Sequence, residues 1–504
     1  MRLMKTKILN LLCSGILFLT FVSCEDFLTR APISDVTDEM LGIDPDANSD
    51  SVKYNSVELA EAILSSAYRS FQTEYYQLDR YIIGDAQSDN CYSGEPKAQT
   101  VQIDQFSIDA NNGNVRRDWS YMYSQISGAN SIIQWVPLNS DPNLTEIRKK
   151  EIVGEASFIR AVAYFNLVRL YGDVPLVLKE IPTLSNDNLE EVYPLLYPAR
   201  QPADSVYAQI IKDLEYATVN CKDYSANKFV ITKPLAHAVL AEVYATKGAP
   251  DNVDWTKVRF HASIVTSNVN YDLMPAFDDL WAAAADESGN KNEHCKESLF
   301  EVDCNSWATI GNWSYQMFMG TDWKKFNTPS KDIEKAFNDA GDTRRKQASI
   351  LYQDVTGKWS DQVWPASAYP FIYKQRVNEK GNIILWRLAS TILLQAEAEN
   401  ELDNLEPAKN LLKKVRNRAG LGNPVSTTKE QLRLEIEKER RLELAFEGYR
   451  WFDLVRTGRA IQVMQSCTDV QSTYAVRLTE NRLIWPIPQT ELDQNDLLIQ
   501  NPGY

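Results

Sequence analysis

The sequence predicts a mostly α-helical protein in which antiparallel helical hairpins stack into an array. Three observations predict this fold. Apolar residues recur at three- and four-residue spacing through most of residues 57–270, as they do on one face of a helix. The pattern breaks over residues 271–385, which are rich in Trp, Gly, Asn and Asp, and returns after residue 386. Alanines gather on several predicted helix faces, where small side chains let helices approach closely.

The first 23 residues have the organisation of a bacterial secretory signal peptide. Cations precede an apolar run over residues 8–22, which is shorter than the roughly 20 residues that a membrane-spanning helix needs. The run ends at Ser23-Cys24, which resembles the lipobox in which the cysteine is acylated and becomes the new N-terminus. We expect Cys24 to carry palmitate as a lipid anchor. Ordinary cleavage, leaving Cys24 as a free thiol or disulfide partner, is the alternative.

A polar tether and the first two helices are predicted next. Residues 24–56 are rich in Asp, Ser and Pro, a composition typical of a linker. A helical pattern begins at Val57. Residues 82–115 are rich in Gly, Asn, Asp and Ser and are predicted to form a loop. A second helix is predicted over residues 118–136, and Pro137 ends it.

The helical pattern continues to about residue 270. Ile152, Ile159 and Leu167 fall on one face of a predicted helix over residues 145–171, which Gly172 ends. Three shorter segments show the same periodicity, one of them rich in alanine: residues 203–219, 233–247 and 254–269.

The C-terminal part begins irregularly and becomes helical again. Residues 271–385 are predicted to hold short strands and loops, with one helix over residues 329–340. Three later segments have helical periodicity, the last of them strongly charged: residues 386–402, 406–419 and 429–446.

The predicted helices form about four hairpins, at residues 57–136, 145–220, 231–269 and 386–419. Hairpins of this length with small residues at the crossing resemble tetratricopeptide repeats, and a generic helical array is the alternative. The sequence therefore predicts a tetratricopeptide-like array with a loop-rich, irregular C-terminal subdomain that contains short strands. Its predicted divisions are a signal peptide (1–23), a lipid-anchored tether (24–56), an N-terminal repeat region (57–270) and a C-terminal region (271–504), itself divided into a loop-rich insert (271–385) and a last repeat with charged helices and a cap (386–504).

The charge of the chain excludes some classes of partner. The net charge is −15, and removal of residues 1–23 takes away three cations and no anions, which gives −15 − 3 = −18. Such a surface is repelled by nucleic-acid phosphates and by anionic headgroups. We therefore expect no nucleic-acid partner, and membrane attachment by the lipid alone.

The usual catalytic and metal-binding motifs are absent from the sequence, and we expect neither cofactor nor metal. The chain has three histidines, of which His237 lies on an alanine-rich predicted helix face and His294 stands beside Cys295. The five cysteines that remain after Cys13 and Cys24 have no regular spacing. Cys295 and Cys304 are placed to pair across a loop, with reduced thiols as the alternative.

Two long motifs carry a resemblance to a known family. One is the charged segment 438–458, which reads KERRLELAFEGYRWFDLVRTG; the other is the C-terminus, with LIWPIP at residues 483–488 and QNPGY at residues 500–504. Both closely resemble the SusD/RagB family of nutrient-binding outer-membrane lipoproteins of Bacteroidetes. Cys24-Glu25-Asp26 also resembles the start and the surface-export signal of such proteins, so the resemblance covers the whole mature chain.

The resemblance implies a function. It implies a protein, not an enzyme, that captures a glycan or oligosaccharide on the outer face of the outer membrane. It also implies a partner, a TonB-dependent transporter of the SusC type, over which the lipoprotein sits as a lid. A peptide-binding RagB-like protein, a surface glycosidase and a pure interaction scaffold are the alternatives.

The charged motif has a physical interpretation of its own. Arginines and carboxylates alternate with apolar residues around Gly448, which favours partly buried ion pairs that lock two helices together. Arginine neighbours hold carboxylates ionised, whereas a general acid needs a raised pKa. We therefore expect Glu443 and Glu447 to be structural. The Pro-Ile-Pro and Asn-Pro-Gly-Tyr segments are predicted to lie across the array as an extended cap.

Two regions are candidates for ligand contact. One is the segment after the first helix, Tyr81 to Tyr92, with polar side chains suited to sugar hydroxyls. The other is the Trp-rich stretch 281–369, because a tryptophan in a loop is less easily explained as array core. Trp307, Trp313 and Trp323 are the preferred set, being closest together and flanked by polar residues. The other candidates are Asp85, Asp89, Asn90, Tyr92, Trp281 and Trp364. Asp278-Asp279 and Asp85/Asp89 are the carboxylates considered for glycoside hydrolysis, each favoured as a loop or turn residue instead.

Overall fold

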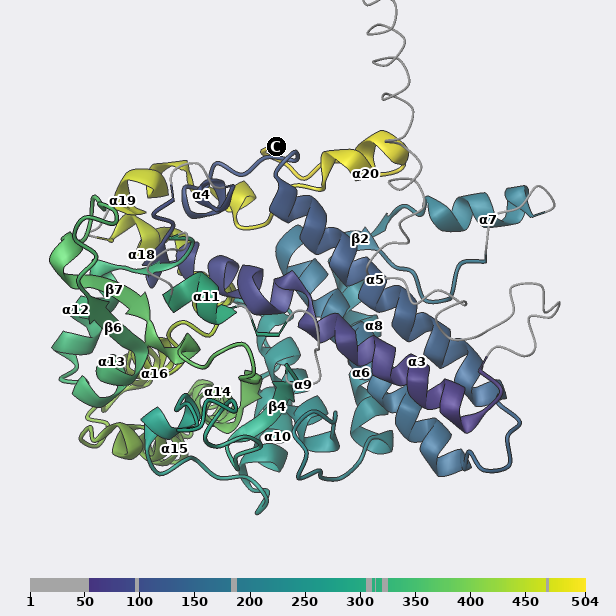
Figure 1. Ribbon diagram of the computed structural model, residues 1–504, viewed down its shortest axis with the longest axis horizontal. Coiled ribbons are helices and arrows are strands. Elements are labelled where there is room, and N and C mark those ends of the chain that lie inside the picture. Colours follow the sequence, from purple (N-terminus) through teal and green to yellow (C-terminus); the bar gives the residue numbers. More distant parts are fainter. Residues whose placement is uncertain are drawn as a thin grey trace, which may run out of the picture. The chain divides into compact units, whose positions relative to one another are not determined.

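The computed structural model describes residues 54–95, 99–182, 188–304, 311–312, 314–319, 325–467 and 471–504 (Figure 1). Cys24 and the predicted tether as far as residue 53 lie outside the described residues, as do Trp307, Trp313 and Trp323.

Stacked helical hairpins form the body of the described chain, as predicted. Helices within each hairpin pack on each other, and successive hairpins meet through α5 on α6, α8 on α9 and α10 on α14. Figure 1 shows α3, α5, α6 and α8 lying side by side. The four pairs are α3 (Val57–Arg69) with α5 (Gly113–Trp135), α6 (Glu146–Tyr171) with α8 (Ala203–Asn220), α9 (Lys233–Thr246) with α10 (Trp255–Thr266), and α14 (Leu388–Glu401) with α15 (Leu405–Ala419).

Local sequence signals explain where these helices begin and end. The Thr145 hydroxyl accepts a hydrogen bond from Arg148 N at 3.2 Å at the start of α6, and Gly172, at φ 72°, ends that helix. Helix α5 begins five residues before the predicted start at residue 118, because the Asn112 side chain caps it by accepting from Asn114 N at 2.9 Å. Most of α6 is buried on all sides, so the array has a thick apolar centre.

The strands are short and antiparallel. In the described residues they form four two-stranded sheets: β1 (Cys91–Tyr92) with β5 (Thr328–Pro329), β2 (Val174–Pro175) with β3 (Arg200–Gln201), β4 (Ser298–Val302) with β8 (Ile383–Arg387), and β6 (Ile350–Gln353) with β7 (Tyr369–Ile372). In the largest sheet Phe300 lies opposite Trp386. The helix predicted from residue 386 therefore starts only at Leu388, whose N–H donates to Glu297 O at 2.8 Å and continues the ladder.

The other α-helices of the described chain, all but α16 of them short, are α4 (Thr100–Asp104), α7 (Leu189–Leu196), α11 (Ser314–Met319), α12 (Lys331–Asp339), α13 (Thr343–Ser349), α16 (Lys429–Glu443), α17 (Arg450–Arg456), α18 (Ala460–Gln465), α19 (Gln471–Tyr474) and α20 (Gln489–Gln494). Two π-helical turns, Tyr75–Asp79 and Ile82–Ala86, occupy the start of the predicted 82–115 loop and the residues before it. Helix α7 was not predicted, since it is short and contains Pro194. The predicted division at residue 270 stays a prediction.

The C-terminal segment lies across the array as the predicted extended cap. Trp485 N donates to Leu170 O at 2.6 Å, and the Asn501 side-chain amide donates to Tyr171 O at 2.9 Å and to Trp485 O at 2.7 Å. The end of α6 is thereby tied to two points of the last 20 residues of the chain.

A buried network of charges joins the charged motif to the rest of the fold. Glu443 is fully buried, and Arg387 Nη1 lies 2.5 Å from its Oε1, while Arg345 Nη1 lies 3.0 Å from its Oε2. Arg418 donates to Glu443 as well and reaches Glu297 at 2.5 Å. Among the described residues six carboxylates and five cations take part: Asp342, Glu297, Glu435, Glu439, Glu443 and Glu447, with Arg345, Lys374, Arg387, Arg416 and Arg418.

The network confirms the structural interpretation of Glu443 and Glu447. Arg387 binds Glu447 through two bonds of 2.7 and 2.8 Å, and Lys374 Nζ lies 2.6 Å from the same carboxylate. Burial raises the pKa of Glu443, but the surrounding guanidinium groups outweigh burial and hold that pKa well below its ordinary value. The pKa of Glu447 is lowered in the same way, by Arg387 and Lys374. Both groups are ionised acceptors, the wrong state for a general acid.

Two glycines bring the charged motif against the segment after α3. The predicted helix over 429–446 ends at Glu443, because Phe446 at φ 64° and Gly448 at φ 78° turn the chain back. A Cβ on Gly84 would lie 2.2 Å from the Gly448 carbonyl carbon. Backbone therefore meets backbone here, and any side chain at residue 84 must push the turn away.

We predict that Gly84→Ala destabilises the fold by about 3 kcal/mol, since overpacking against backbone cannot be relieved by a rotamer change. Gly128→Ala is the matched control. Gly128 lies within α5 with open space around its Cα, so alanine should instead stabilise by about 0.5–1 kcal/mol. Urea denaturation measures both changes. Equal effects of the two substitutions would contradict the proposed close contact.

Candidate functional site

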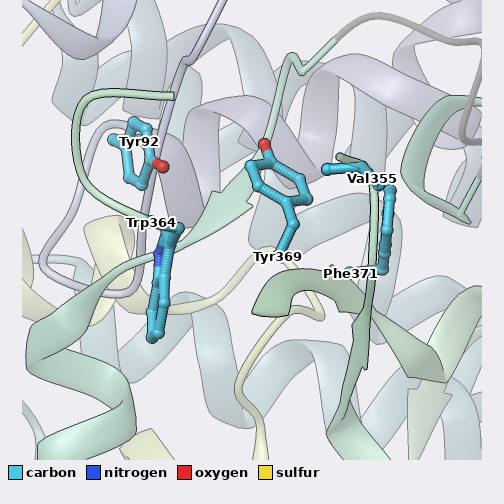
Figure 2. Close-up of a cluster of buried hydrophobic side chains, with 5 residues drawn as sticks. All are labelled: Tyr92, Val355, Trp364, Tyr369 and Phe371. Atoms are coloured by element: carbon cyan, nitrogen blue, oxygen red, sulfur yellow. The ribbon is translucent and has the colours of Figure 1, made fainter. Parts of the chain in front are cut away.

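Strands β1 and β5 bring the two predicted ligand regions together. Tyr92, from the first region, lies opposite Thr328 in this ladder. It belongs to a cluster of buried side chains, called here the aromatic cluster, whose other members are Val355, Trp364 and Tyr369 of the second region and Phe371 just after it. Figure 2 shows Tyr369 in the middle, with Tyr92 and Trp364 on one side and Val355 and Phe371 on the other.

Trp359 packs on the aromatic cluster and is only partly buried. Its ring centroid lies 5.6 Å from that of Tyr369 and 6.2 Å from that of Phe371, both in edge-to-face geometry. The indole Nε1 of Trp359 is buried and has no hydrogen-bond partner among the described residues. A partly exposed indole on a rigid aromatic base is suited to stacking on a flat ligand.

Polar groups lie beside Trp359. The Asp361 carboxylate accepts from the Tyr92 hydroxyl at 2.7 Å and from Val363 N at 2.8 Å. Lys325 Nζ donates to Ser360 O at 2.9 Å and lies 3.6 Å from the Asp361 carboxylate. Gly94 N donates to Lys325 O at 2.7 Å, which extends the β1–β5 ladder to the residues beside the Trp359 ring. Trp359, Lys325 and Asp361 are not among the candidates predicted from the sequence. The signal available was a Trp between Gly357 and Asp361 in a segment without helical periodicity.

The predicted aromatic candidates that the structure describes are buried. Trp364 donates from Nε1 to Pro329 O at 2.8 Å, and Lys331 Nζ lies 3.1 Å from the centre of its ring. Trp281 packs in a different cluster with Phe277, where Lys374 Nζ lies 5.1 Å from its ring. Trp364 and Tyr92 therefore lie in the aromatic cluster against which Trp359 packs, whereas Trp281 does not, and contact with ligand stays a prediction for all three.

The predicted polar candidates hold the charged motif. Asp85 accepts hydrogen bonds from Gly448 N at 2.8 Å and from the Asn90 amide at 2.9 Å. Asp89 makes a two-pronged ion pair with Arg450, at 2.7 and 2.9 Å. All three side chains are fully or nearly fully buried with partners inside the chain. Their observed role is to dock residues 84–90 on the turn at Gly448, and their contact with ligand stays a prediction.

The remaining sequence candidates have structural partners. His294 Nδ1 accepts from Lys228 N at 3.1 Å, and His237 and His261 face each other with their Nδ1 atoms 2.9 Å apart. The described side chains contain no cluster of three or more His, Cys, Asp or Glu arranged to bind a metal ion. The five described cysteines are free, so Cys295 and Cys304 are not paired. Every helix within the described ranges is too short or too polar to cross a bilayer.

The array of hairpins with its irregular, loop-built subdomain defines a tetratricopeptide-like helical-repeat protein. Sequence comparison gives the family. A model described as the SusD family matches residues 312–504, and one described as starch-binding and associating with the outer membrane matches residues 39–245. The chain belongs to the SusD family.

Individual relatives agree with this assignment. SusD-like protein P38 of Formosa agariphila is 27% identical over 526 residues, which cover 96% of each chain. A SusD superfamily protein from Bacteroides vulgatus has the same fold, with a TM-score of 0.76 at 20% identity over 90% of this chain and 100% of that one. A protein described as a laminarin-binding SusD-like protein gives a TM-score of 0.68 at 24% identity, over 89% and 100%.

The buried Asp89–Arg450 pair predicts a specific pH dependence. Burial raises the pKa of Asp89, but Arg441 and Arg450 outweigh burial and lower that pKa to about 2. A lowered folded-state pKa contributes stability above the unfolded pKa of about 3.9, and this stability is lost as the pH falls towards about 2. We expect Asp89→Asn to cost about 2 kcal/mol at pH 7, from roughly 1.36 kcal/mol per pKa unit.

The difference between wild type and Asp89→Asn should then shrink as the pH falls from about 4 to about 2. Urea unfolding at several pH values measures it. Asp251→Asn, on the exposed turn before α10, is the control and should follow wild type throughout. A stability difference for Asp89→Asn that is the same at every pH would refute the assignment.

Proposed function

We propose that this protein is a cell-surface lipoprotein that captures a glycan or oligosaccharide and delivers it to a TonB-dependent outer-membrane transporter of the SusC type. It does so by binding, without catalysis. The observation that carries the proposal is the partly exposed indole of Trp359 on the aromatic cluster, beside the polar groups of Lys325 and Asp361.

Further tryptophans lie close in the sequence to residues of this surface. Met319 packs against the aromatic cluster, and Lys325 Nζ lies 6.0 Å from the Trp359 ring. The segment between them in the sequence contains Trp323, and Trp313 directly precedes α11. Several indoles are therefore carried by the stretches of chain that lead to and from the cluster. Burying a sugar face on one such ring contributes on the order of 1 to 2 kcal/mol.

The polar groups suit a hydroxylated ligand. The Lys325 ammonium group beside the indole can donate to the hydroxyls that project from the rim of a pyranose ring, while the buried Asp361 carboxylate holds Lys325 in place. The names of relatives support the same class of ligand, since one family model is described as starch-binding and one solved structure as laminarin-binding.

Attachment to the outer membrane follows from the N-terminus. Lipid on Cys24 and the acidic residues after it would hold the protein at the outer face, with residues 24–56 as a tether that lets it move over a transporter. The description of the matching family model as associating with the outer membrane supports this location.

We predict that Trp359→Ala weakens glycan binding about 5- to 30-fold, because about 1–2 kcal/mol of stacking is lost. Replacing Trp307, Trp313 and Trp323 together with alanine should abolish binding. Affinity electrophoresis against a polysaccharide panel that includes starch and laminarin measures both. Trp135→Ala is the matched control, since this partly buried indole lies on α5 and donates to Glu180.

The same panel separates the alternatives. Retention of a cationic peptide mixture, with no mobility shift in any polysaccharide, would favour a peptide-binding protein of the RagB type. Release of shorter sugars from an oligosaccharide by the purified protein would favour a glycosidase. Unchanged glycan binding after loss of all four indoles would reject the aromatic surface as the site.

We also predict that Cys24→Ser abolishes membrane attachment. Without the thiol no lipid can be added, and the acidic chain has no affinity of its own for anionic headgroups. Detergent phase partitioning and labelling of cells with a radioactive fatty acid measure the effect. Recovery of the variant in the membrane fraction, still labelled, would show that another residue carries the lipid.

A further inference from the structure

Helix α7 exposes apolar side chains on nearly every side. Val192 is its one buried residue among the eight of the helix, whereas Leu189 is 48% exposed and Tyr193 55% exposed. Leu195 and Leu196 are exposed as well. Figure 1 shows α7 standing apart from the neighbouring helices of the array. An eight-residue helix that buries so little of its apolar surface gains little from packing within this chain.

A second exposed apolar segment adjoins α7. Leu497 is 59% exposed and Ile499 is 74% exposed, in the cap that follows α20. Two hydrogen bonds join this segment to the residues after α7. The Asn495 amide donates to Pro198 O at 3.0 Å, and Arg200 donates to Ile499 O at 2.5 Å. The exposed apolar residues of α7 and of the cap thus belong to one stretch of surface, called here the apolar–acidic surface.

The charges around these residues are almost all negative. Glu190 and Glu191 are exposed on α7, and Asp493 and Asp496 are exposed on α20 and just after it. Residues 188–201 contain one cation, Arg200, and residues 489–504 contain none. Its guanidinium is used internally, because it donates to Asp173 O, Ile499 O and Asn501.

The charge selects among possible occupants. An anionic membrane surface is disfavoured, since the acidic side chains would be repelled by its headgroups. A second copy of this chain is disfavoured too, because a twofold contact would set the same acids against each other. A partner protein whose contact face is apolar at its centre and positively charged at its edge matches both the exposed apolar residues and the acidic ones.

We infer that the apolar–acidic surface holds a partner protein whose contact face has apolar side chains within a rim of Lys and Arg. The inference rests on the proposed function, because the transporter is the partner which that function requires. Apolar residues at the centre supply affinity, and the opposite charges at the edge set orientation and association rate. The surface differs from the aromatic cluster in every residue, so the two can be tested separately.

Photo-cross-linking in intact cells identifies the occupant. A photoreactive amino acid replaces Tyr193 in the full-length lipoprotein, and Phe260, which is 58% exposed on α10, is replaced in a control. Residue 193 should cross-link to the transporter, through a peptide rich in Lys or Arg, and residue 260 should not. Adducts only with lipid, only with a second copy, or with nothing would overturn the inference. An adduct with a different basic protein would keep the surface and reject the transporter as its partner.

Substitutions test the same surface by co-purification with the transporter from detergent-solubilised outer membranes. Tyr193→Asp with Ile499→Asp, and separately Glu190→Lys with Glu191→Lys, should reduce the yield of transporter at least tenfold. Phe260→Asp and Asp251→Lys are the controls. Glycan binding by the purified variants should be unchanged, which separates failure of this inference from failure of the proposed function. If both double variants of the apolar–acidic surface co-purify as much transporter as the wild type, the inference is overturned.

Discussion

The burial of Glu443 among three arginines is the interaction on which the rest of the structure depends. Each charge in this network is costly to remove from water, and the cost is offset only when all partners are present. The partners come from distant parts of the chain: Glu297 precedes β4, Arg387 ends β8, and Arg418 lies in α15. The last hairpin of the array and the irregular subdomain are therefore specified together. If only part of this charge network formed, an unpaired charge would be left in an apolar interior.

The network also positions the candidate surface. It fixes the end of α16, and the turn that follows offers Phe446 N and Gly448 N to the Asp85 carboxylate. Asp85 and Asp89 then dock the segment that leads into β1, which places Tyr92 in the aromatic cluster. A surface suited to ligand is thus supported by a chain of contacts that begins in the core. This explains why the most specific sequence motif lies far from the side chains proposed to bind sugar.

The repetitive parts of the fold could be predicted from the sequence, and the irregular parts could not. Hairpin helices such as α6 and α15 have clear apolar periodicity and glycine ends, so their bounds were predicted within a few residues. Alternating arginines and carboxylates indicated ion pairs correctly, because such groups seldom stay buried alone. That Asp85 and Asn90 are buried and hold the turn at Gly448 could not be predicted, since a buried polar side chain and an exposed one are identical in sequence. Trp359 was overlooked for the complementary reason: its half-exposed position is created by β6 and β7, which pair residues about 20 apart in a stretch without periodicity.

The two-residue β1–β5 ladder has a consequence for how such proteins diversify. On its far side Gly94 N donates to Lys325 O, and Lys325 in turn reaches Ser360 and Asp361. None of these residues is among the carboxylates and cations that surround Glu443. Exchanges at the candidate surface therefore leave every charge partner of Glu443 in place. Under the proposed function, the ladder is thus a junction between an unchanged core and a variable ligand surface, and loops grafted at this position between relatives would transfer ligand preference without altering the charge network.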